Sequence, residues 1–266
     1  MQITTNITWG HVGELTEVLN QLLKERKKER IDARKKEQMI ADTYTNLSHD
    51  IRTPLTSLDG YFQLLEEAEI EADRTRYIQI IQERIDSLKE MLEELFTYTK
   101  LQNETYELKL ERINLNQILK ETVFSYFDSW MERGITPKFD ITEEPIYMQG
   151  NAQALRRTMQ NIIKNGLDHG NKEIGIRLQK QGKEAELVFC NKVSHPEEID
   201  TSRVFERFYK ADEARSRNST GLGLSIAKGF VDKMEGEITA EVVSGRFAIQ
   251  IRFVCEEDRK REKVYR

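Results

Sequence analysis

Hydrophobic residues recur at helical spacing near the start of the chain and then give way to a dense run of charges. The apolar positions that share one helix face are Leu15, Val18, Leu19, Leu22 and Leu23. The segment KERKKERIDARKKEQ that follows is mostly charged, with both signs mixed. These features predict a solvated linker helix with a thin apolar seam over about residues 1–41. Two interpretations stay open: a coiled-coil linker that enters the next helix, or a membrane-proximal signal helix whose basic residues face anionic lipid.

The apolar pattern strengthens from about Tyr44. Six residues fall within one arc of about 80° on a helical wheel: Leu47, Ile51, Leu55, Leu58, Phe62 and Leu65. A second stripe follows the acidic segment EEAEIEADR and consists of Tyr77, Ile81, Ile85, Leu88, Leu92, Leu95 and Thr99. Two amphipathic helices with a short connection predict an antiparallel hairpin. One hairpin cannot bury both stripes against itself, so we expect a dimer in which two hairpins form a four-helix bundle.

The periodicity changes after residue 106 and predicts a domain that mixes helices with strands. Helices are expected over residues 115–130, 152–166 and 224–234. Strands are expected at 138–141 and 146–148, in EIGIRLQ and AELVFCNKV, and in a hairpin of EITAEVV and RFAIQIRFV. The fold class is therefore α+β: a helical-hairpin dimerisation domain at 42–106, then an α/β sandwich at 107–256, then a charged tail at 257–266.

His49 and Pro54 lie in the segment NLSHDIRTPLT, within the first predicted hairpin helix. A proline inside a helix costs roughly 3 kcal/mol, because it removes a hydrogen bond and clashes with the preceding turn. On the wheel, His49 lies about 160° from the middle of the apolar stripe, and Thr53 lies one turn along on nearly the same face. The helix is therefore expected to present the imidazole to solvent.

Composition and charge limit the classes of function. The 266 residues carry 46 acidic and 41 basic side chains, a formal net charge of −5, which argues against a general nucleic-acid binder. The two cysteines, Cys190 and Cys255, lie far apart and form no metal-ligand spacing, so a reduced cytoplasmic chain is expected. The sequence has no run of 18 apolar residues and no opening signal peptide, so we expect it not to span a membrane itself.

Four segments resemble the signature boxes of one enzyme family. SHDIRTPLTS, NIIKNGLDHG, RVFERFYKAD and STGLGLSIAKGFV are similar, in this order, to the H, N, F and second glycine boxes of bacterial sensor histidine kinases. That family joins a dimerising helical hairpin to a Bergerat-type ATP-binding domain, and the resemblance covers about residues 42–255. It makes the hairpin a histidine phosphotransfer domain and the sandwich the catalytic ATP-binding domain.

The resemblance implies an ATP-dependent protein-histidine kinase that phosphorylates its own histidine with MgATP. The phosphoryl group would pass to an aspartate of a response regulator, and the kinase would also dephosphorylate that regulator. The partners implied are a second copy of the chain and the regulator. A tether to the inner face of the cell membrane would lie in segments of a longer parent protein that are absent from this chain. The alternative is a nucleotide-binding pseudokinase or scaffold that signals by shape through the dimer.

In the H box, the resemblance makes His49 the phosphate acceptor. A neutral imidazole is a competent nucleophile near pH 7. Asp50 would accept the other ring proton and raise the basicity of the nucleophile. Thr53 matches a family position that orients water for dephosphorylation of the regulator; the alternative is a hydroxyl that bonds back to its own helix turn. Pro54 matches the proline that bends the helix below the histidine.

In the N box, Asn161 and Asn165 are four residues apart and share a helix face. Amide oxygens suit Mg²⁺, which takes oxygen ligands and keeps several waters plus substrate phosphates. The resemblance assigns Asn165 to the metal and Asn161 to a place beside the phosphates of ATP. His169 has no Cys or His partner at a suitable spacing, so no separate metal site is predicted there.

In the second glycine box, Gly221 and Gly223 come immediately before a predicted helix. Glycines let backbone amides approach phosphate oxygens, and the start of the helix adds partial positive charge. The resemblance assigns the whole segment to the nucleotide site: Thr220, Gly221, Leu222, Gly223 and Leu224.

The F box precedes this segment and resembles the start of a lid over the nucleotide. Phe205 and Phe208 would anchor the lid, with Phe208 counted in the nucleotide site. Lys210 matches a basic position that approaches the terminal phosphate of ATP. Arg215 and Arg217 add positive charge to the same segment.

The chain departs from the family at the first glycine box, which usually reads Asp-x-Gly-x-Gly, with the aspartate binding the adenine amino group. The corresponding position is Asn191 in FCNKVSHPEEID, and both glycines are absent. Asparagine keeps an acceptor oxygen for the amino group and adds a donor for a ring nitrogen. The resemblance therefore makes Asn191 the adenine-binding residue. The alternative is that Asn191 merely ends a strand, while stacking and backbone contacts hold the adenine.

Overall fold

The computed structural model describes residues 10–103, 105–170, 173–210 and 220–256. The chain folds as two compact units, Met1–Ile78 and Gln79–Arg266. The lid residues Arg215 and Arg217 and the predicted tail at 257–266 lie outside the described residues. Within the described ranges, no helix combines the length and the apolar character that crossing a membrane requires.

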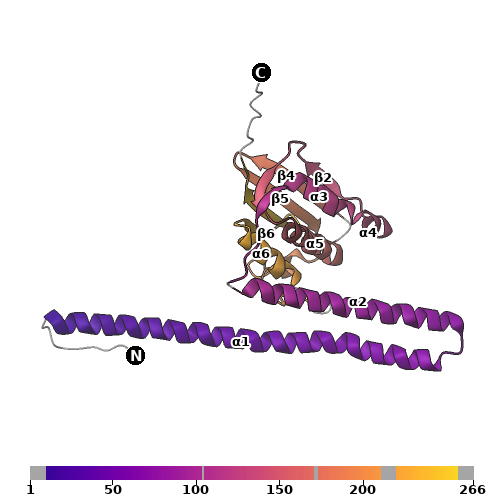
Figure 1. Ribbon diagram of the computed structural model, residues 1–266, viewed down its shortest axis with the longest axis horizontal. Coiled ribbons are helices and arrows are strands. Elements are labelled where there is room, and N and C mark those ends of the chain that lie inside the picture. Colours follow the sequence, from indigo (N-terminus) through magenta and orange to yellow (C-terminus); the bar gives the residue numbers. More distant parts are fainter. Residues whose placement is uncertain (1–9, 104, 171–172, 211–219, 257–266) are drawn as a thin grey trace, which may run out of the picture. The chain divides into compact units, whose positions relative to one another are not determined.

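The first unit contains helix α1 (Gly10–Glu67) and the first two turns of helix α2 (Glu71–Gln102). Helix α1 continues through the charged segment and through Pro54, so the predicted linker helix and the first hairpin helix are one helix (Figure 1). A short connection at residues 68–70 joins α1 to α2, and the rings of Tyr61 and Tyr77 lie 6.0 Å apart beside it. The predicted hairpin connection is therefore confirmed.

The predicted apolar stripe of α1 is only partly covered in the single chain. Leu58 is buried, and Ile51 and Leu65 are half-buried. Leu55 and Phe62 stay 48% and 49% exposed. Burying such a side chain fully is worth roughly 1.5–3 kcal/mol, so these residues leave apolar surface that a second pair of helices can cover.

The second unit is built on a five-stranded mixed sheet with the strand order β2-β4-β5-β7-β6. Its strands are β2 (Lys138–Ile141), β4 (Ile174–Gln181), β5 (Glu184–Lys192), β6 (Glu237–Val243) and β7 (Arg246–Val254). The β2–β4 pair is parallel and the other pairs are antiparallel. A separate antiparallel pair joins β1 (Glu111–Asn114) to β3 (Tyr147–Gly150).

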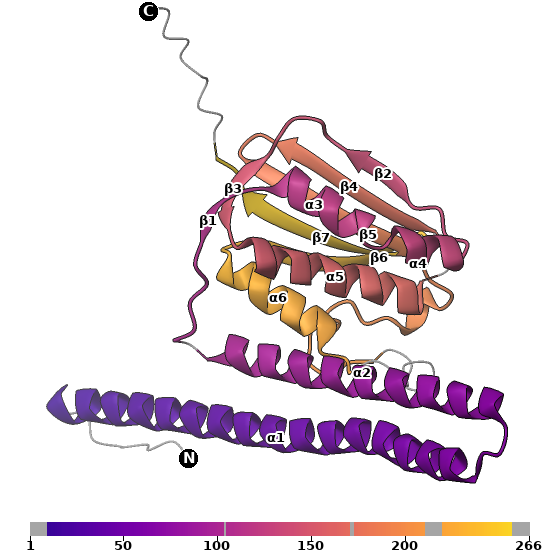
Figure 2. The same cartoon turned by 45° about the vertical axis from the view of Figure 1, so that its right-hand side comes forward.

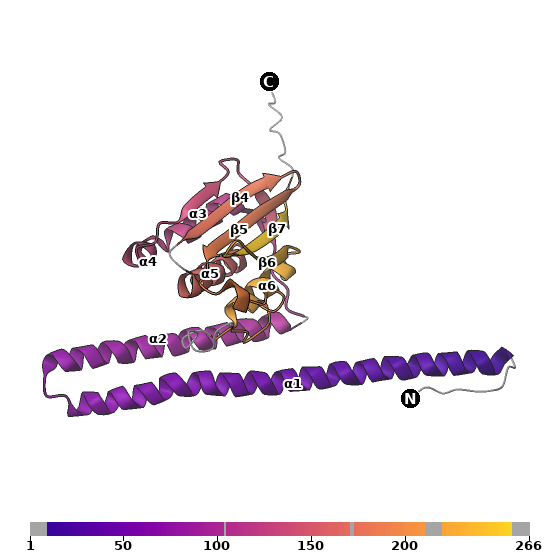
Figure 3. The same cartoon turned by 180° about the vertical axis from the view of Figure 1, so that it is seen from behind.

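Helices cover one face of this sheet and leave the other face open. The covering helices are α3 (Leu115–Phe124), α5 (Ala152–His169) and α6 (Gly223–Lys233) (Figure 2). Leu187 and Ile251 are fully buried in the core beneath them. Figure 3 shows the opposite face of the sheet, which no described helix covers. Gln250 and Glu186 alternate with buried residues along β7 and β5, and Gln250 donates a hydrogen bond to Glu186 on this face. This two-layer arrangement confirms the predicted α/β sandwich.

The structure corrects the predicted helix over residues 115–130, which is interrupted and becomes α3 and the short helix α4 (Phe127–Glu132). At the break, the hydroxyls of Thr122 and Ser125 donate at 2.7 Å to the carbonyls of Ile118 and Thr122. Such donors compete with backbone amides for helix carbonyls, which explains the interruption. Strand β1 and the 3₁₀ turn at Pro196–Glu198 are too short for the apolar pattern to predict.

Two helices of the second unit set the position of the candidate site. Asn151 caps the start of α5, because its Oδ1 accepts a hydrogen bond from the amide of Ala154 at 2.9 Å. The part of α2 that belongs to this unit buries one face, formed by Met91, Glu94, Tyr98 and Leu101. A Cβ placed on Gly229 would lie 3.2 Å from Cδ1 of Leu101, so α2 and α6 pack closely.

Candidate functional site

His49 presents its imidazole to solvent, as the helical wheel predicts, with a side chain that is 77% exposed. Its Nδ1 lies 3.6 Å from Oδ1 of Asp50, within ion-pair range but beyond hydrogen-bond length. A carboxylate at this position favours the tautomer that carries its proton on Nδ1. The lone pair of the imidazole then lies on Nε2.

Thr53 lies one helical turn after His49, and its hydroxyl donates to the carbonyl of His49 at 3.3 Å. This is the back-bonded conformation that the sequence left open as the alternative to a role with water. A rotation about χ1 is needed to turn the hydroxyl toward solvent. Pro54 follows directly and has no N–H to donate to the carbonyl of Asp50.

A cavity of about 320 Å³ lies in the second unit. This volume is at the lower end of the range of small-molecule sites, which is about 300–1,000 Å³. The predicted nucleotide residues that line it are Asn161, Asn165, Asn191, Lys210, Thr220, Gly221, Gly223 and Leu224. Segments that lie far apart in the sequence therefore converge on one hollow, with α5 and the start of α6 on its sides.

Asn161 ties helix α5 to the first residue of α6. Its side chain is 7% exposed, and its Nδ2 donates to the carbonyl of Gly223 at 2.9 Å. The hydroxyl of Thr220 accepts a hydrogen bond from the amide of Leu222 at 3.1 Å. The side chain of Leu222 is fully buried in the core, so this predicted site residue does not line the cavity and contributes through its backbone.

The backbone of the F box passes close to the backbone of the glycine segment (residues 220–224) at Phe208 and Gly221. The amide of Phe208 donates to the carbonyl of Gly221 at 3.0 Å, and both residues have positive φ, at 57° and 68°. The Phe208 side chain packs against the core and does not line the cavity. A Cβ on Gly221 would lie 2.7 Å from Cα of Phe208, which only a glycine avoids.

We expect Gly221→Ala to lower the melting temperature and the nucleotide affinity more than Gly182→Ala does. Gly182 has a φ of +64°, and a Cβ there would meet nothing within 4 Å, so its substitution adds backbone strain alone. The clash at Gly221 adds roughly 1–3 kcal/mol to that strain. Thermal melts of both variants measure the difference. Equal melting temperatures would show that the backbones at Phe208 and Gly221 move apart at no cost in stability, and would contradict this interpretation.

Asn191 is the next-to-last residue of strand β5 and is 8% exposed at the wall of the cavity. It is paired in the sheet with Ile174 and Phe247, so its position is fixed on both sides. Its Nδ2 donates a long hydrogen bond, of 3.5 Å, to the carbonyl of Lys192. A buried amide with one weak bond offers a donor and an acceptor to a ligand in the cavity.

Asn165 lies half-buried in the cavity wall, one turn after Asn161 on the same face of α5. Its amide oxygen is a hard ligand of the kind that Mg²⁺ accepts, and the cavity leaves room for phosphate oxygens and waters to complete the coordination. The residues present therefore fit a magnesium ion that is held through one side chain and the bound substrate.

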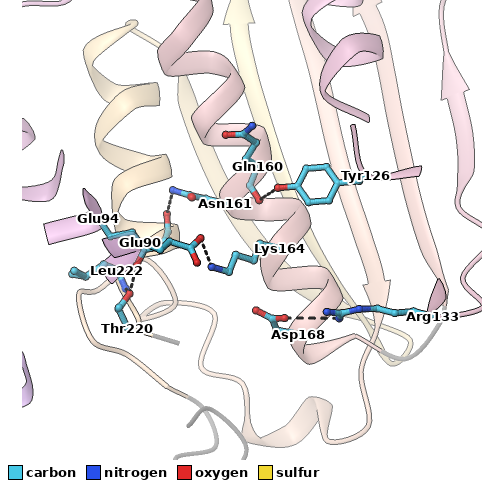
Figure 4. Close-up of polar contacts among 11 residues, drawn as sticks. Glu90, Glu94, Tyr126, Arg133, Gln160, Asn161, Lys164, Asp168, Thr220 and Leu222 are labelled. Atoms are coloured by element: carbon cyan, nitrogen blue, oxygen red, sulfur yellow. Dashed lines mark hydrogen bonds and ion pairs between the residues drawn. The ribbon is translucent and has the colours of Figure 1, made fainter. Parts of the chain in front are cut away.

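Sequence reasoning missed Asp168, which also lines the cavity (Figure 4). Its Oδ1 lies 3.9 Å from Nη1 of Arg133. Burial raises the pKa of Asp168 above its ordinary value, and nearby positive charges, of which Lys164 acts most strongly, lower it only in part. The side chain of Asp168 is still 36% exposed, and it takes up a proton at a higher pH than an unperturbed aspartate does. The only signal in the sequence was its place at the end of the N box.

Sequence reasoning also missed the contribution of α2 to the cavity. Four residues of this helix line it: Ser87, Glu90, Met91 and Glu94. Nζ of Lys164 lies 2.5 Å from Oε1 of Glu90, and the hydroxyl of Thr220 donates to the carboxylate of Glu94 (Figure 4). The available signal was a second face at helical spacing on α2, to which Met91, Tyr98 and Leu101 belong.

Two family models match the chain. The His Kinase A (phospho-acceptor) domain matches residues 39–104. The model described as histidine kinase-, DNA gyrase B-, and HSP90-like ATPase matches residues 150–259. The first match contains His49, and the second contains the predicted nucleotide residues from Asn161 to Leu224.

Curated proteins with similar sequences bear the names of sensor kinases. Sensor histidine kinase YcbM of Bacillus subtilis (strain 168) is 32% identical over 213 residues, which cover 78% of this chain and 68% of that protein. Sensor protein VanS of Enterococcus faecium is 31% identical over 229 residues, which cover 84% of this chain and 59% of that protein. The chain thus spans about six to seven tenths of these two relatives.

Solved structures share the fold. Histidine kinase AdeS of Acinetobacter baumannii superimposes with a TM-score of 0.62 at 18% identity, covering 79% of this chain and 98% of that one. Histidine kinase ThkA, solved in complex with response regulator protein TrrA, gives a TM-score of 0.65 at 18% identity, covering 89% of this chain and 67% of that one.

Proposed function

Because the chain belongs to the sensor histidine kinases of bacterial two-component systems, which are ATP-dependent, we propose that His49 accepts phosphate from MgATP bound in the cavity of the second unit. The main support for this proposal is that the N-box asparagines, Asn191 and the glycine segment all line one cavity. The exposure of His49 supports its role as the acceptor, since a buried imidazole would not reach a substrate.

The chemistry follows from the groups at each site. Nε2 of His49 attacks the terminal phosphorus of ATP, a bond from nitrogen to phosphorus forms, and the bond to the bridging oxygen of ADP breaks. The Asp50 carboxylate stabilises the positive charge that develops on the ring. Magnesium, when bound, neutralises charge on the phosphate oxygens. Catalysis is otherwise a matter of positioning, since phosphoryl transfer requires little further chemistry from the protein.

Different residues of the cavity are proposed to bind different parts of MgATP. Asn191 binds the adenine base, and Asn165 holds magnesium through its amide oxygen. The backbone from Gly221 to Gly223, at the start of α6, binds the phosphates. Asn161 supports this backbone through its bond to the carbonyl of Gly223. Lys210, which also lines the cavity, approaches the terminal phosphate.

The proposed partners are a second copy of the chain and a response regulator. The exposed Leu55 and Phe62 supply apolar surface for the dimer. The regulator receives phosphate from His49 onto an aspartate. Thr53 serves the reverse reaction after its hydroxyl turns to solvent, and the dephosphorylation rate with Thr53→Ala tests that role. A tether to the inner face of the membrane, in segments of a longer parent protein, stays a prediction.

Incubation of the purified chain with radiolabelled ATP and magnesium tests the proposed kinase. We expect label that is lost in acid and kept in alkali, as for a phosphate on histidine nitrogen, and we expect EDTA to prevent labelling because the phosphate charge is then not neutralised. The absence of both first-box glycines bears on nucleotide affinity, and the alternative function is a nucleotide-binding pseudokinase or scaffold that signals through the dimer. A chain that binds a non-hydrolysable ATP analogue but takes up no label would establish that alternative.

A further inference from the structure

Two carboxylates of α2, those of Glu90 and Glu94, line the cavity. Glu90 and Glu94 are four residues apart, so both lie on the face of α2 that meets α5 and the glycine segment. Glu90 pairs with Lys164, and Glu94 accepts a hydrogen bond from the hydroxyl of Thr220 (Figure 4). All of these residues belong to the second unit.

Glu94 is 6% exposed, which is unusual for a charged side chain on a helix surface. Its neighbours on the buried face of α2, Met91 and Tyr98, are apolar or aromatic. Burying a carboxylate among them costs several kcal/mol unless polar groups compensate. Among the described residues, the hydroxyl of Thr220 offsets this cost by donating a hydrogen bond to Glu94. The position of Glu94 therefore depends on the glycine segment.

The Thr220 hydroxyl connects Glu94 to the backbone at the start of α6. It accepts from the amide of Leu222 at 3.1 Å while it donates to Glu94. The hydroxyl of Thr220 thus links the carboxylate of Glu94 to the backbone amide of Leu222, and each of these hydrogen bonds polarises the other. Glu90 meanwhile neutralises Lys164, a cation of the same cavity wall.

We propose that Glu90 and Glu94 compete intramolecularly with the phosphates of the nucleotide. The inference rests on the proposed function, because it takes this cavity as the ATP site. With α2 in place, a triphosphate would meet two carboxylates and a lysine that is already paired. The docked form therefore binds ATP weakly, and ATP binding releases residues 87–94 of α2 from the cavity. Docking of α2 lowers the affinity for nucleotide by some factor. By thermodynamic linkage, bound nucleotide lowers the equilibrium constant for docking of α2 by the same factor.

Contacts outside the cavity hold α2 to the fold without the two carboxylates. Arg207 lies over the ring of Tyr98, at 5.8 Å from its centroid. Leu101 packs against Gly229 of α6. Nζ of Lys233 donates at 2.6 Å to the carbonyl of Tyr106, which follows α2 in the chain. Substitution of Glu90 and Glu94 by glutamine, which keeps size and hydrogen bonding, is therefore expected to leave the second unit folded.

Calorimetric titration of the full chain tests the competition, with adenosine, ADP and a non-hydrolysable ATP analogue in magnesium. The variants are Glu94→Gln, Glu90→Gln and the double substitution, with Glu93→Gln as the matched control on the exposed side of the same turn. We expect the double variant to bind the ATP analogue about tenfold more tightly than the parent. The gain should be smaller for ADP and absent for adenosine, and the control should match the parent within about twofold.

Three other results of these titrations would contradict the competition or the proposed function. Equal ATP affinity in the parent and the double variant overturns the competition and leaves the nucleotide site standing. An equal gain for adenosine means that α2 only restricts access to the cavity, which also overturns it. If neither the parent nor any variant binds nucleotide at millimolar concentration, the proposed function fails and the competition fails with it.

Discussion

His49→Gln is expected to take up no phosphate from MgATP while it binds the nucleotide as tightly as the parent chain does. The substitution removes the nucleophilic nitrogen, and His49 is not among the residues that line the cavity. Gel-based detection of radiolabel measures the first quantity, and calorimetry with a non-hydrolysable analogue measures the second. His11→Gln, the other histidine of α1, is the matched control and is expected to label normally. Normal labelling of His49→Gln would remove His49 from the mechanism.

Asn191→Ala is expected to weaken ATP binding by about 1–3 kcal/mol, the usual cost of leaving a buried polar partner unsatisfied. This corresponds to a loss of affinity of roughly 5- to 150-fold. The reason is that the buried amide at the cavity wall offers both a donor and an acceptor to adenine, and alanine offers neither. Asn191→Asp keeps the acceptor for the adenine amino group, so it should retain substantial binding.

Calorimetric titration of the parent, Asn191→Ala and Asn191→Asp with the same ATP analogue measures these effects. Thermal melts of the three proteins control for loss of folding, because Asn191 lies in the middle of the sheet between β4 and β7. Alanine binding as tightly as asparagine would show that Asn191 merely ends a strand. Adenine would then be held by stacking and backbone contacts.

Much of the fold could be predicted because alternation of apolar residues is a local signal. The expected strands at 138–141, 237–243 and 246–254 match β2, β6 and β7 residue for residue. In β6 and β7 every second side chain faces the core, so a pattern with a period of two residues predicts these strands without knowledge of distant contacts. In β2, at the edge of the sheet, only Ile141 packs against the core. The break between α3 and α4 escaped prediction, because it depends on which carbonyls the hydroxyls of Thr122 and Ser125 select.

The candidate site could be predicted where short segments carry its residues, as in the N box and the glycine segment. Their side chains and backbone reach the cavity because α5 and α6 pack side by side. Leu222 and Phe208 show the limit of that reasoning: both lie in predicted segments, yet their side chains pack in or against the core. Glu94 shows another limit, since its burial arises only when this part of α2 packs against the rest of the second unit.

Mapping of the residue that becomes phosphorylated tests whether MgATP in this cavity places its terminal phosphoryl group on His49. The parent chain is incubated with MgATP, digested under neutral to alkaline conditions that preserve phosphohistidine, and sequenced by mass spectrometry. We expect one phosphoryl group, on the imidazole of His49. Phosphate on a different residue, or no phosphate in a chain that binds the ATP analogue, would contradict it.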